Sequence, residues 1–256
     1  MSDASGTSVR GSAVTRGSRR QAPPRFYFSL RSPYSWLAYR DLLAHAPDVV
    51  ELLEWRPFWE PDEASARALT AAGGHFPYVA MSREKHLYIL QDVRRLTCER
   101  GLEATWPVDR EPCWEVPHLA WMAAADAGRG QAFLARAYRA RWQEGQDICD
   151  PSVIGALAVE LGLPAERLAG AAHDPHLRER GVAALLDVHR DGVFGVPFLV
   201  DGYDKYWGTD RVSVFVQSVR ERQLGGRGKS GKVNAPMPLA DTVARSADTG
   251  HSGGCG

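Results

Sequence analysis

The chain has 256 residues, which is enough to bury a sizeable core as one domain with an insertion. Its 31 basic and 31 acidic residues balance, so no overall field favours nucleic acid, an anionic membrane surface or a polyacidic partner. The apolar stretches are short and interrupted by charges, whereas a membrane-spanning helix needs roughly 18 to 20 apolar residues. We therefore expect a soluble protein that binds neither nucleic acid nor membrane.

Both ends of the chain have the composition of disordered tails. Residues 1–24 are rich in Ser, Gly, Thr and Arg and lack the hydrophobic region of a secretory signal. Residues 224–256 are rich in Gly, Ser and Lys at first and end in Gly-Gly-Cys-Gly. We expect one folded domain over residues 25–223 and a cytoplasmic location.

A strand and a helix are the first ordered elements that the sequence predicts. Residues 26–30 form an aromatic run of high strand propensity. Ser32 is a good helix N-cap, Pro33 suits the first helical position, and apolar residues recur behind them at helical spacing. The helix is expected to end near His45, and residues 49–55 then predict a second strand, parallel to the first.

The middle of the chain, residues 83–172, is predicted to be helical. Two apolar stripes mark helices in its first half, and the pattern then predicts helices over residues 131–144, 151–161 and 164–172. Glycines mark three helix ends, as expected where a helix finishes in a left-handed residue: Gly128, Gly145 and Gly162.

Strands return near the end of the folded part. Residues 195–208 predict a hairpin that turns at Asp201-Gly202, and Thr209 with Asp210 is expected to cap a last helix through Gln217. Two strands, a long helical segment, a hairpin and a closing helix follow the order of an α/β thioredoxin-like fold with a helical insertion. The insertion would cover about residues 80–190.

The cysteines do not form a recognisable redox or metal motif. They are widely spaced, without a Cys-x-x-Cys pair or histidines at metal-ligand spacing: Cys98, Cys113, Cys149 and Cys255. We expect neither a disulfide framework nor a metal site.

Three stretches together resemble a known family. They are Ser32-Pro33-Tyr34-Ser35-Trp36-Leu37, Gly192-Val193-Phe194-Gly195-Val196-Pro197 and Trp207-Gly208-Thr209-Asp210-Arg211. They resemble the 2-hydroxychromene-2-carboxylate isomerase and kappa-class glutathione transferase group of DsbA-like proteins, over roughly residues 25–220. The resemblance implies a DsbA-like fold, glutathione or another low-molecular-weight thiol as cofactor, and a small conjugated or aromatic substrate. Members are often dimeric, so a homodimer is expected.

Ser32 stands where a disulfide oxidoreductase carries its attacking cysteine, and the resemblance implies that its hydroxyl donates to the bound sulfur. From the residues alone, Ser32 is explained as an N-cap. Lowering the pKa of a free thiol from near 8.5 by about two units requires roughly 2.7 kcal/mol of preference for the anion. A helix N-terminus contributes about 0.3 to 1 kcal/mol and a hydrogen bond to a charged group about 1.5 to 3. Both contributions are therefore needed, while Ser35 is expected to be structural.

The resemblance also implies the residues that hold the thiol. A cis peptide before Pro197 would expose the Val196 backbone to the cysteinyl part, and Thr209 with Asp210 would bind the γ-glutamyl end. Lys85 matches a lysine that contacts glutathione. Each of these residues also has a plainer explanation, because Thr209 and Asp210 suit any helix start and Lys85 suits a solvated helix surface.

One segment departs from the family pattern. An asparagine upstream of the matching lysine in kappa-class enzymes has no counterpart in residues 73–77, which read Gly-Gly-His-Phe-Pro. The bound thiol therefore need not be glutathione itself.

Aromatic and histidine side chains offer further candidates around the site. An aromatic roof for a flat substrate, or alternatively plain core, is expected of Trp106, Trp114, Trp121 and Trp142 with Tyr138. His75 and His118 are candidate acid-base partners for a substrate enol.

Three activities compete. A thiol-dependent isomerase and a kappa-like transferase share every motif and differ in whether the product gains the mass of the thiol. A disulfide oxidoreductase is disfavoured, because exchange needs an attacking thiolate and no cysteine occupies the turn. A binding protein without turnover is the non-enzymatic alternative.

Overall fold

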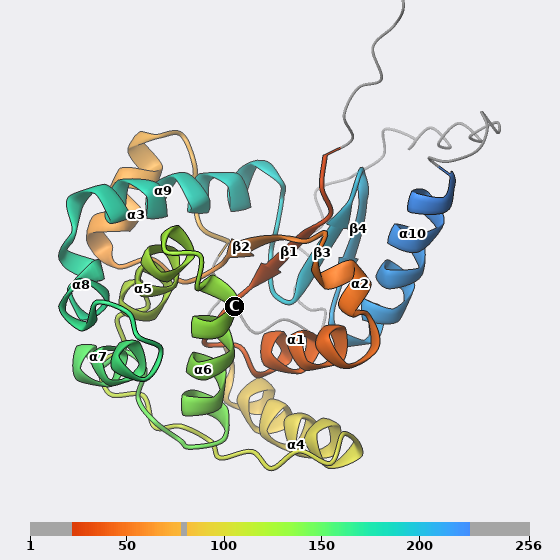
Figure 1. Cartoon of the computed structure of the whole chain (residues 1–256), viewed down its shortest axis with the longest axis horizontal. Coiled ribbons are helices and arrows are strands. Elements are labelled where there is room, and N and C mark those ends of the chain that lie inside the picture. Colours follow the sequence, from red (N-terminus) through yellow and green to blue (C-terminus); the bar gives the residue numbers. More distant parts are fainter. Residues whose placement is uncertain (1–21, 78–80, 226–256) are drawn as a thin grey trace, which may run out of the picture.

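The computed structural model describes residues 22–77 and 81–225. Four strands form one mixed sheet in the order β2-β1-β3-β4: β1 (Arg25–Phe28), β2 (Glu54–Pro57), β3 (Phe198–Asp201) and β4 (Asp204–Trp207) (Figure 1). Strands β1 and β2 are parallel, as predicted, and β3 is antiparallel to both β1 and β4. The expected tails lie largely in residues 1–21 and 226–256, outside the described residues.

Helix α1 (Pro33–His45) confirms the prediction for the first helix at both ends. Ser32 is its N-cap and Pro33 its first residue. Because proline has no backbone N–H and a fixed φ, it suits a position whose N–H has no partner within the helix. Local sequence is therefore sufficient to start α1 at the end of the turn that leaves β1.

The predicted position of the second strand was wrong by several residues. The apolar residues near Val49 belong to a short helix, α2 (Pro47–Val50), and the strand begins only at Glu54. Pro47 starts this helical turn, and Val49 is buried through it rather than through a strand. The ladder to β1 is continued at its end by the Phe58 N–H, which donates to the Phe28 carbonyl at 2.7 Å.

Helices fill the segment between β2 and β3. They are α3 (Glu63–Ala71), α4 (Arg83–Glu99), α5 (Glu115–Asp126), α6 (Gly130–Trp142), α7 (Pro151–Glu160), α8 (Ala165–Ala169), the 3-10 helix η1 (Ala171–His173) and α9 (Pro175–Arg190). The predicted helices are confirmed with small shifts, and Gly128, Gly145 and Gly162 have φ of 69°, 67° and 65°. Helices α3 and α9 were not predicted from the sequence.

The hairpin is confirmed, but the start of the last helix was predicted wrongly. Gly202 turns the hairpin with φ 66°. Thr209 does not cap a helix through its side chain; it begins the 3-10 helix η2 (Thr209–Arg211), and α10 (Val212–Gly225) follows. Gly208 precedes η2 with φ 102°, a conformation that favours glycine.

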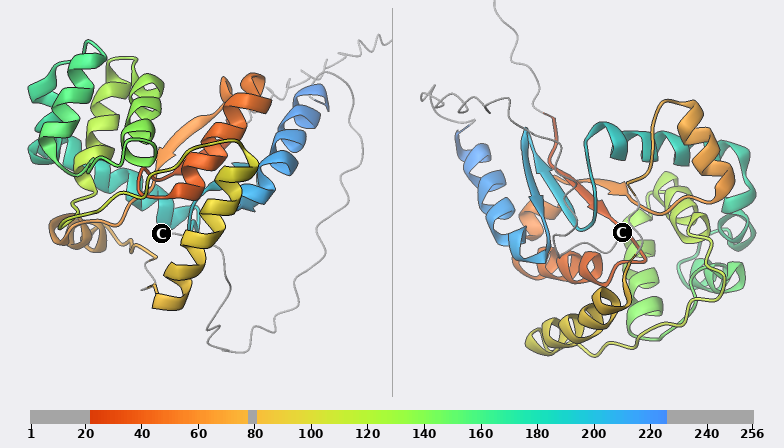
Figure 2. Two further views of the ribbon diagram at one scale, coloured as in Figure 1. Left: turned by 90° about the horizontal axis from the view of Figure 1, so that it is seen from below. Right: turned by 180° about the vertical axis from the view of Figure 1, so that it is seen from behind.

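Two cores enclose the sheet, because successive strand residues point to opposite faces. Phe26, Phe28 and Leu199 belong to the core that includes α1 and α10, whereas Tyr27 and Phe198 belong to the core that includes Val188 of α9. Helices α5 to α8 form a lobe beyond the β2 edge of the sheet, whereas α10 lies near the β4 edge (Figures 1 and 2). No helix among the described residues is long and apolar enough to cross a membrane.

Candidate functional site

The register of the sheet brings the three motif stretches to one end of the molecule. Tyr27 of β1 lies opposite Phe198 of β3, so the last residue of β1 and the residues just before β3 lie at the same end of the sheet. Phe198 in turn lies opposite Trp207 of β4. The Gly208 N–H donates to the Pro197 carbonyl at 3.0 Å, which fixes the start of η2 beside this loop. The turn that carries Ser32 therefore lies at the same end of the sheet as both other motifs.

Ser32 is buried, and its side chain caps α1. Its Oγ accepts the Ser35 N–H at 3.2 Å, while the Ser35 Oγ accepts the Ser29 N–H at 3.2 Å. A serine hydroxyl can accept and donate at the same time, so capping leaves the Ser32 hydrogen available to an anion. Ser35 holds the turn, in agreement with the structural role predicted for it.

The turn before Ser32 is anchored from the helical lobe by two side chains. The His118 Nε2 accepts the Leu30 N–H at 3.1 Å, and its Nδ1 donates to the Trp114 carbonyl at 2.7 Å. The Tyr138 hydroxyl donates to the Ser29 carbonyl at 3.1 Å. These bonds occupy both ring nitrogens of His118 and define its neutral tautomer.

The prediction that His118 acts as an acid-base partner was wrong. Its side chain is 0 % exposed, and burial lowers its pKa to about 3, so it stays neutral near pH 7. Its ring stacks on Trp59 at 5.2 Å. His75 lies elsewhere, with its ring 4.4 Å from that of His189 on α9, and among the described residues it has no hydrogen bond or ring contact with the Ser32 turn.

The peptide bond between Val196 and Pro197 is cis, as predicted. Val196 is buried, and the Pro197 carbonyl is already used by Gly208. Thr209 and Asp210 follow at once in η2. The structure therefore places four of the predicted thiol-binding residues on one continuous edge.

Thr209 and Asp210 line a cavity of about 550 Å³ between α1, the end of α4 and α10. The Asp210 side chain is 69 % exposed, and its carboxylate is 3.5 Å from the Arg211 guanidinium. A carboxylate this open to solvent remains able to bind an ammonium group. The cavity therefore offers space for a ligand beside Thr209 and Asp210.

Lys85 is in the first turn of α4 and is partly exposed. Its backbone N–H donates to the Ser82 Oγ at 3.2 Å. Helix α4 is tied to α1 by the Tyr34 hydroxyl, which donates to Asp92 at 2.8 Å. The lysine thus belongs to the helix that flanks α1, but within residues 22–77 and 81–225 its ammonium group makes no hydrogen bond with Ser32.

The aromatic residues proposed as a roof are mostly core. Trp142 is stacked on Trp36 at 6.2 Å, and Trp114 and Trp121 are also buried. Only Trp106, at 40 % exposed, has a large open surface among the four. The alternative of plain core packing therefore holds for most of this set.

A smaller cavity of about 220 Å³, which was not predicted from the sequence, lies beside the Ser32 turn. Arg31, three residues that follow β2 and four residues at the start of α5 line it. The only sequence signal for it was the place of Arg31, immediately before Ser32.

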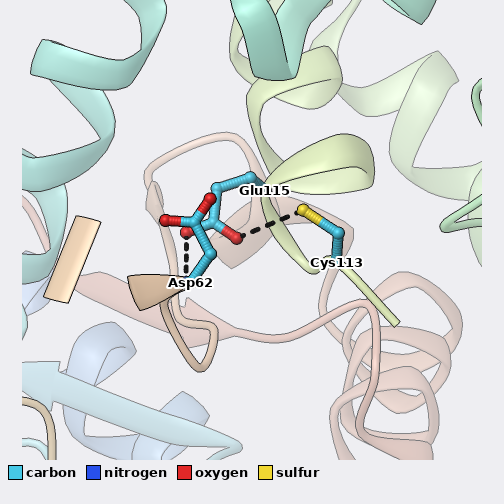
Figure 3. Close-up of side chains that lie close together, drawn as sticks. All are labelled: Asp62, Cys113 and Glu115. Carbon is cyan, nitrogen blue, oxygen red and sulfur yellow. Dashed lines mark hydrogen bonds between the residues drawn. The ribbon is translucent and has the colours of Figure 1, made fainter. Parts of the chain in front are cut away.

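Asp62, Cys113 and Glu115 converge at the wall of this smaller cavity, with ligand-type atoms within 4.8 Å of one another (Figure 3). Asp62 already accepts from Arg178 at 2.7 Å, and Glu115 accepts the Asp62 N–H at 2.8 Å. The Cys113 thiol donates to Glu115, and burial raises its pKa, whereas a metal ligand must be a thiolate. The donor set does not fit a metal ion.

Comparisons with known proteins identify the family and the fold. A model of the DSBA-like thioredoxin domain matches residues 25–220. A 2-hydroxychromene-2-carboxylate isomerase from Sphingobium xenophagum is 29 % identical over 197 residues, which cover 75 % of this chain and 95 % of that protein.

Solved structures show the same fold. A 2-hydroxychromene-2-carboxylate isomerase structure matches with a TM-score of 0.63 and 22 % identity, over 80 % of this chain and 99 % of the other. The cytosolic disulfide reductase DsbM from Pseudomonas aeruginosa, solved with GSH, matches with a TM-score of 0.51 and 21 % identity, over 79 % of this chain and 98 % of the other.

Proposed function

The chain belongs to the DSBA-like thioredoxin domain family, and on that premise we propose that it uses glutathione or another small thiol to isomerise a conjugated carbonyl compound. The observation that carries the proposal is Ser32, which caps α1 in the turn after β1 and keeps a hydroxyl hydrogen free for a thiolate. A hydroxyl in this place can stabilise a bound thiolate but cannot itself exchange disulfides.

The binding residues suit a peptide-like thiol. The cis Val196–Pro197 peptide lies at the edge where an extended ligand could add to the sheet, and Asp210 offers a carboxylate to an amino group. Thr209 adds a hydroxyl, and Lys85 would approach from α4. A thiol bound with its sulfur at Ser32 would extend past the Val196–Pro197 peptide to η2.

The catalytic contribution of this chain is then electrostatic. The N-terminus of α1 and the Ser32 hydroxyl favour the thiolate over the thiol by about 2 to 4 kcal/mol together. When bound, the thiol would supply the nucleophile for reversible addition to the conjugated double bond, rotation and elimination. The similarity to the isomerase from Sphingobium xenophagum supports this reaction.

A kappa-like transferase remains the second candidate, because it would use the same residues. Mass spectrometry of the product separates the two: isomerisation leaves the substrate mass unchanged, and transfer adds the mass of the thiol. A cytoplasmic homodimer is expected for either activity, and gel filtration with light scattering tests the dimer.

The decisive experiment is calorimetric titration with reduced glutathione in two buffers of different ionisation enthalpy. We expect binding to release protons near pH 7 in the native protein, and Ser32→Ala to reduce that release. Asp150→Ala removes the N-cap of α7 and serves as a control for the loss of a cap alone. Equal proton release by the native and Ser32→Ala proteins would contradict the proposal, and absence of binding would direct the same test to other thiols.

A further inference from the structure

The cavity of about 550 Å³ beside Thr209 and Asp210 is larger than the γ-glutamyl end of glutathione requires. From η2 it continues along α1 as far as His45, and the end of α4 bounds its other side. Cavities that hold whole small molecules measure about 300 to 1,000 Å³. This cavity therefore has room for a chemical group that glutathione does not possess.

Glutathione with its sulfur at Ser32 does not reach the far part of this cavity. Asp41 lines that part and follows Ser32 by nine residues, which corresponds to roughly 13 Å along α1 at 1.5 Å per residue. The γ-glutamyl arm has about seven bonds between the sulfur and the carbon that bears the amino group, so it spans about 9 Å when fully extended. Its amino group would stop near Asp210, and the space beside Asp41 would stay empty.

The two arginines that line the cavity are already neutralised by carboxylates. Arg100 donates from Nε and Nη2 to the two oxygens of Asp41, at 2.9 and 2.8 Å. Arg220 donates in the same way to Asp48, at 2.9 and 2.7 Å. Both pairs are bidentate, so a phosphate or carboxylate in the cavity would meet positive charge that is already compensated. The cavity therefore does not select an anionic group.

Two other carboxylates of the lining remain available to a ligand. The Glu99 side chain makes no hydrogen bond or ion pair within the described part of the chain. Asp210 has only its contact with Arg211 at 3.5 Å. The hydroxyls of Thr209 and Ser213 line the same cavity. Because carboxylates only accept hydrogen bonds and hydroxyls both accept and donate, this lining favours a ligand with several O–H donors.

The remaining surface of the cavity includes apolar side chains. Ala46 lies at the end of α1, and Val212 and Val216 lie on α10. Sugar-like rings carry hydroxyls at their edges and C–H groups on their faces, so they suit a cavity that combines carboxylates with valines. A lone ammonium group would match the carboxylates but would leave the apolar surface uncovered.

We infer that this cavity binds an uncharged, polyhydroxylated group joined to the cysteine of the thiol cofactor, so that the preferred thiol is longer than glutathione. Two linked sugar-like rings beyond the cysteine would extend roughly 14 Å from the sulfur, which is far enough to reach Asp41. That the ligand is a cofactor thiol rests on the proposed function. Binding of the polyhydroxylated group itself requires no thiolate, so S-methylated thiols also report on it.

Calorimetric titration with mycothiol and with glutathione tests the inference, because mycothiol carries glucosamine and inositol on its cysteine and has no γ-glutamyl group. We expect the native protein to bind mycothiol about 10-fold more tightly or better, and the S-methyl derivatives to keep this preference. Bacillithiol, in which a malate dianion replaces the inositol, should bind about 10-fold more weakly than mycothiol or worse.

Two variants with matched controls place the ligand in the cavity. Glu99→Ala removes one acceptor and should weaken mycothiol binding about 10-fold, with less than about a 2-fold effect on glutathione. Glu103→Ala, at an exposed glutamate outside the lining, should change neither affinity. Ser213→Phe fills the cavity and should weaken mycothiol binding more than glutathione binding. Val214→Phe, at the next exposed position of α10 and outside the lining, is its control.

The fold should survive these substitutions. Glu99 is the last residue of α4, where a negative charge is unfavourable to the helix dipole, so its removal should not lower the melting temperature. The inference is overturned if glutathione or bacillithiol binds as tightly as mycothiol, or if Glu99→Ala and Ser213→Phe weaken mycothiol binding no more than their controls do.

The same titrations separate this inference from the proposed function. If S-methyl mycothiol is preferred while no free thiol releases protons in a Ser32-dependent way, the thiolate chemistry is wrong and the cavity assignment stands. If glutathione binding releases protons that depend on Ser32 and mycothiol is not preferred, the cavity assignment is wrong and the thiolate chemistry stands.

Discussion

The backbone N–H of Leu30, which is two residues before Ser32, donates to the Nε2 of His118 at 3.1 Å. This bond joins α5 of the helical segment to the turn that begins α1. The geometry of the turn is therefore set partly by a residue 88 positions further along the chain.

Replacement of His118 should destabilise the fold in proportion to the hydrogen bonds lost. His118→Leu leaves the buried Leu30 N–H without an acceptor, and we expect a cost of about 1 to 3 kcal/mol in the free energy of unfolding. His118→Gln retains an acceptor and should cost less. Urea unfolding measures both, and equal costs for the two variants would mean that packing, not this bond, matters at the site.

His118 should also make stability depend on pH. Its pKa is about 3 in the folded protein, below the value of about 6.5 expected when it is unfolded. The contribution of neutral His118 to the free energy of unfolding is therefore complete above about pH 6.5 and is lost as the pH falls towards 3. Over this range the free energy of unfolding falls by up to about 1.4 kcal/mol per pH unit. Unfolding midpoints at pH 7.5, 6 and 5 should fall more steeply for the native protein than for His118→Gln.

Gly208 should be sensitive to substitution because it controls the position of Asp210. Its φ is 102°, and a Cβ there would lie 2.6 Å from the Asp210 Oδ1. Gly208→Ala should cost about 1 to 2 kcal/mol and also weaken thiol binding, because the carboxylate must move. Gly202→Ala, at φ 66° with nothing within 4 Å, is the control for backbone strain alone. Equal thiol affinity in the two variants would contradict this role of Gly208.

Asp210 should contribute to ligand binding and not to folding. Its side chain is largely exposed and has only a loose contact with Arg211. Asp210→Asn is therefore expected to change the free energy of unfolding by less than about 0.5 kcal/mol. If an amino group binds there, glutathione affinity should fall about 10-fold or more. Calorimetry and thermal melting on the same samples measure the two effects, and a drop in stability without loss of affinity would contradict the assignment.

Local signals in the sequence determined the elements that depend on few residues. Ser32 and Pro33 start α1 because a cap and a fixed φ act within one turn, and Gly202 turns the hairpin for a similar reason. The motifs at Ser32, Pro197 and Asp210 identified the family before any contact was known. The second strand was misplaced because apolar character alone does not separate the buried residue of a short helix, Val49, from one in a strand.

Only the tertiary structure decided how these segments combine. The sheet register places the cis Val196–Pro197 peptide beside the end of β1, and the Gly208 bond to Pro197 aligns η2 with it. The tertiary structure also shows that His118 is a buried structural residue and not an acid-base group, because desolvation and two hydrogen bonds keep its ring neutral. It also revealed the cavity at Arg31. Burial, partners and cavities depend on contacts between residues far apart in the chain, which sequence spacing does not specify.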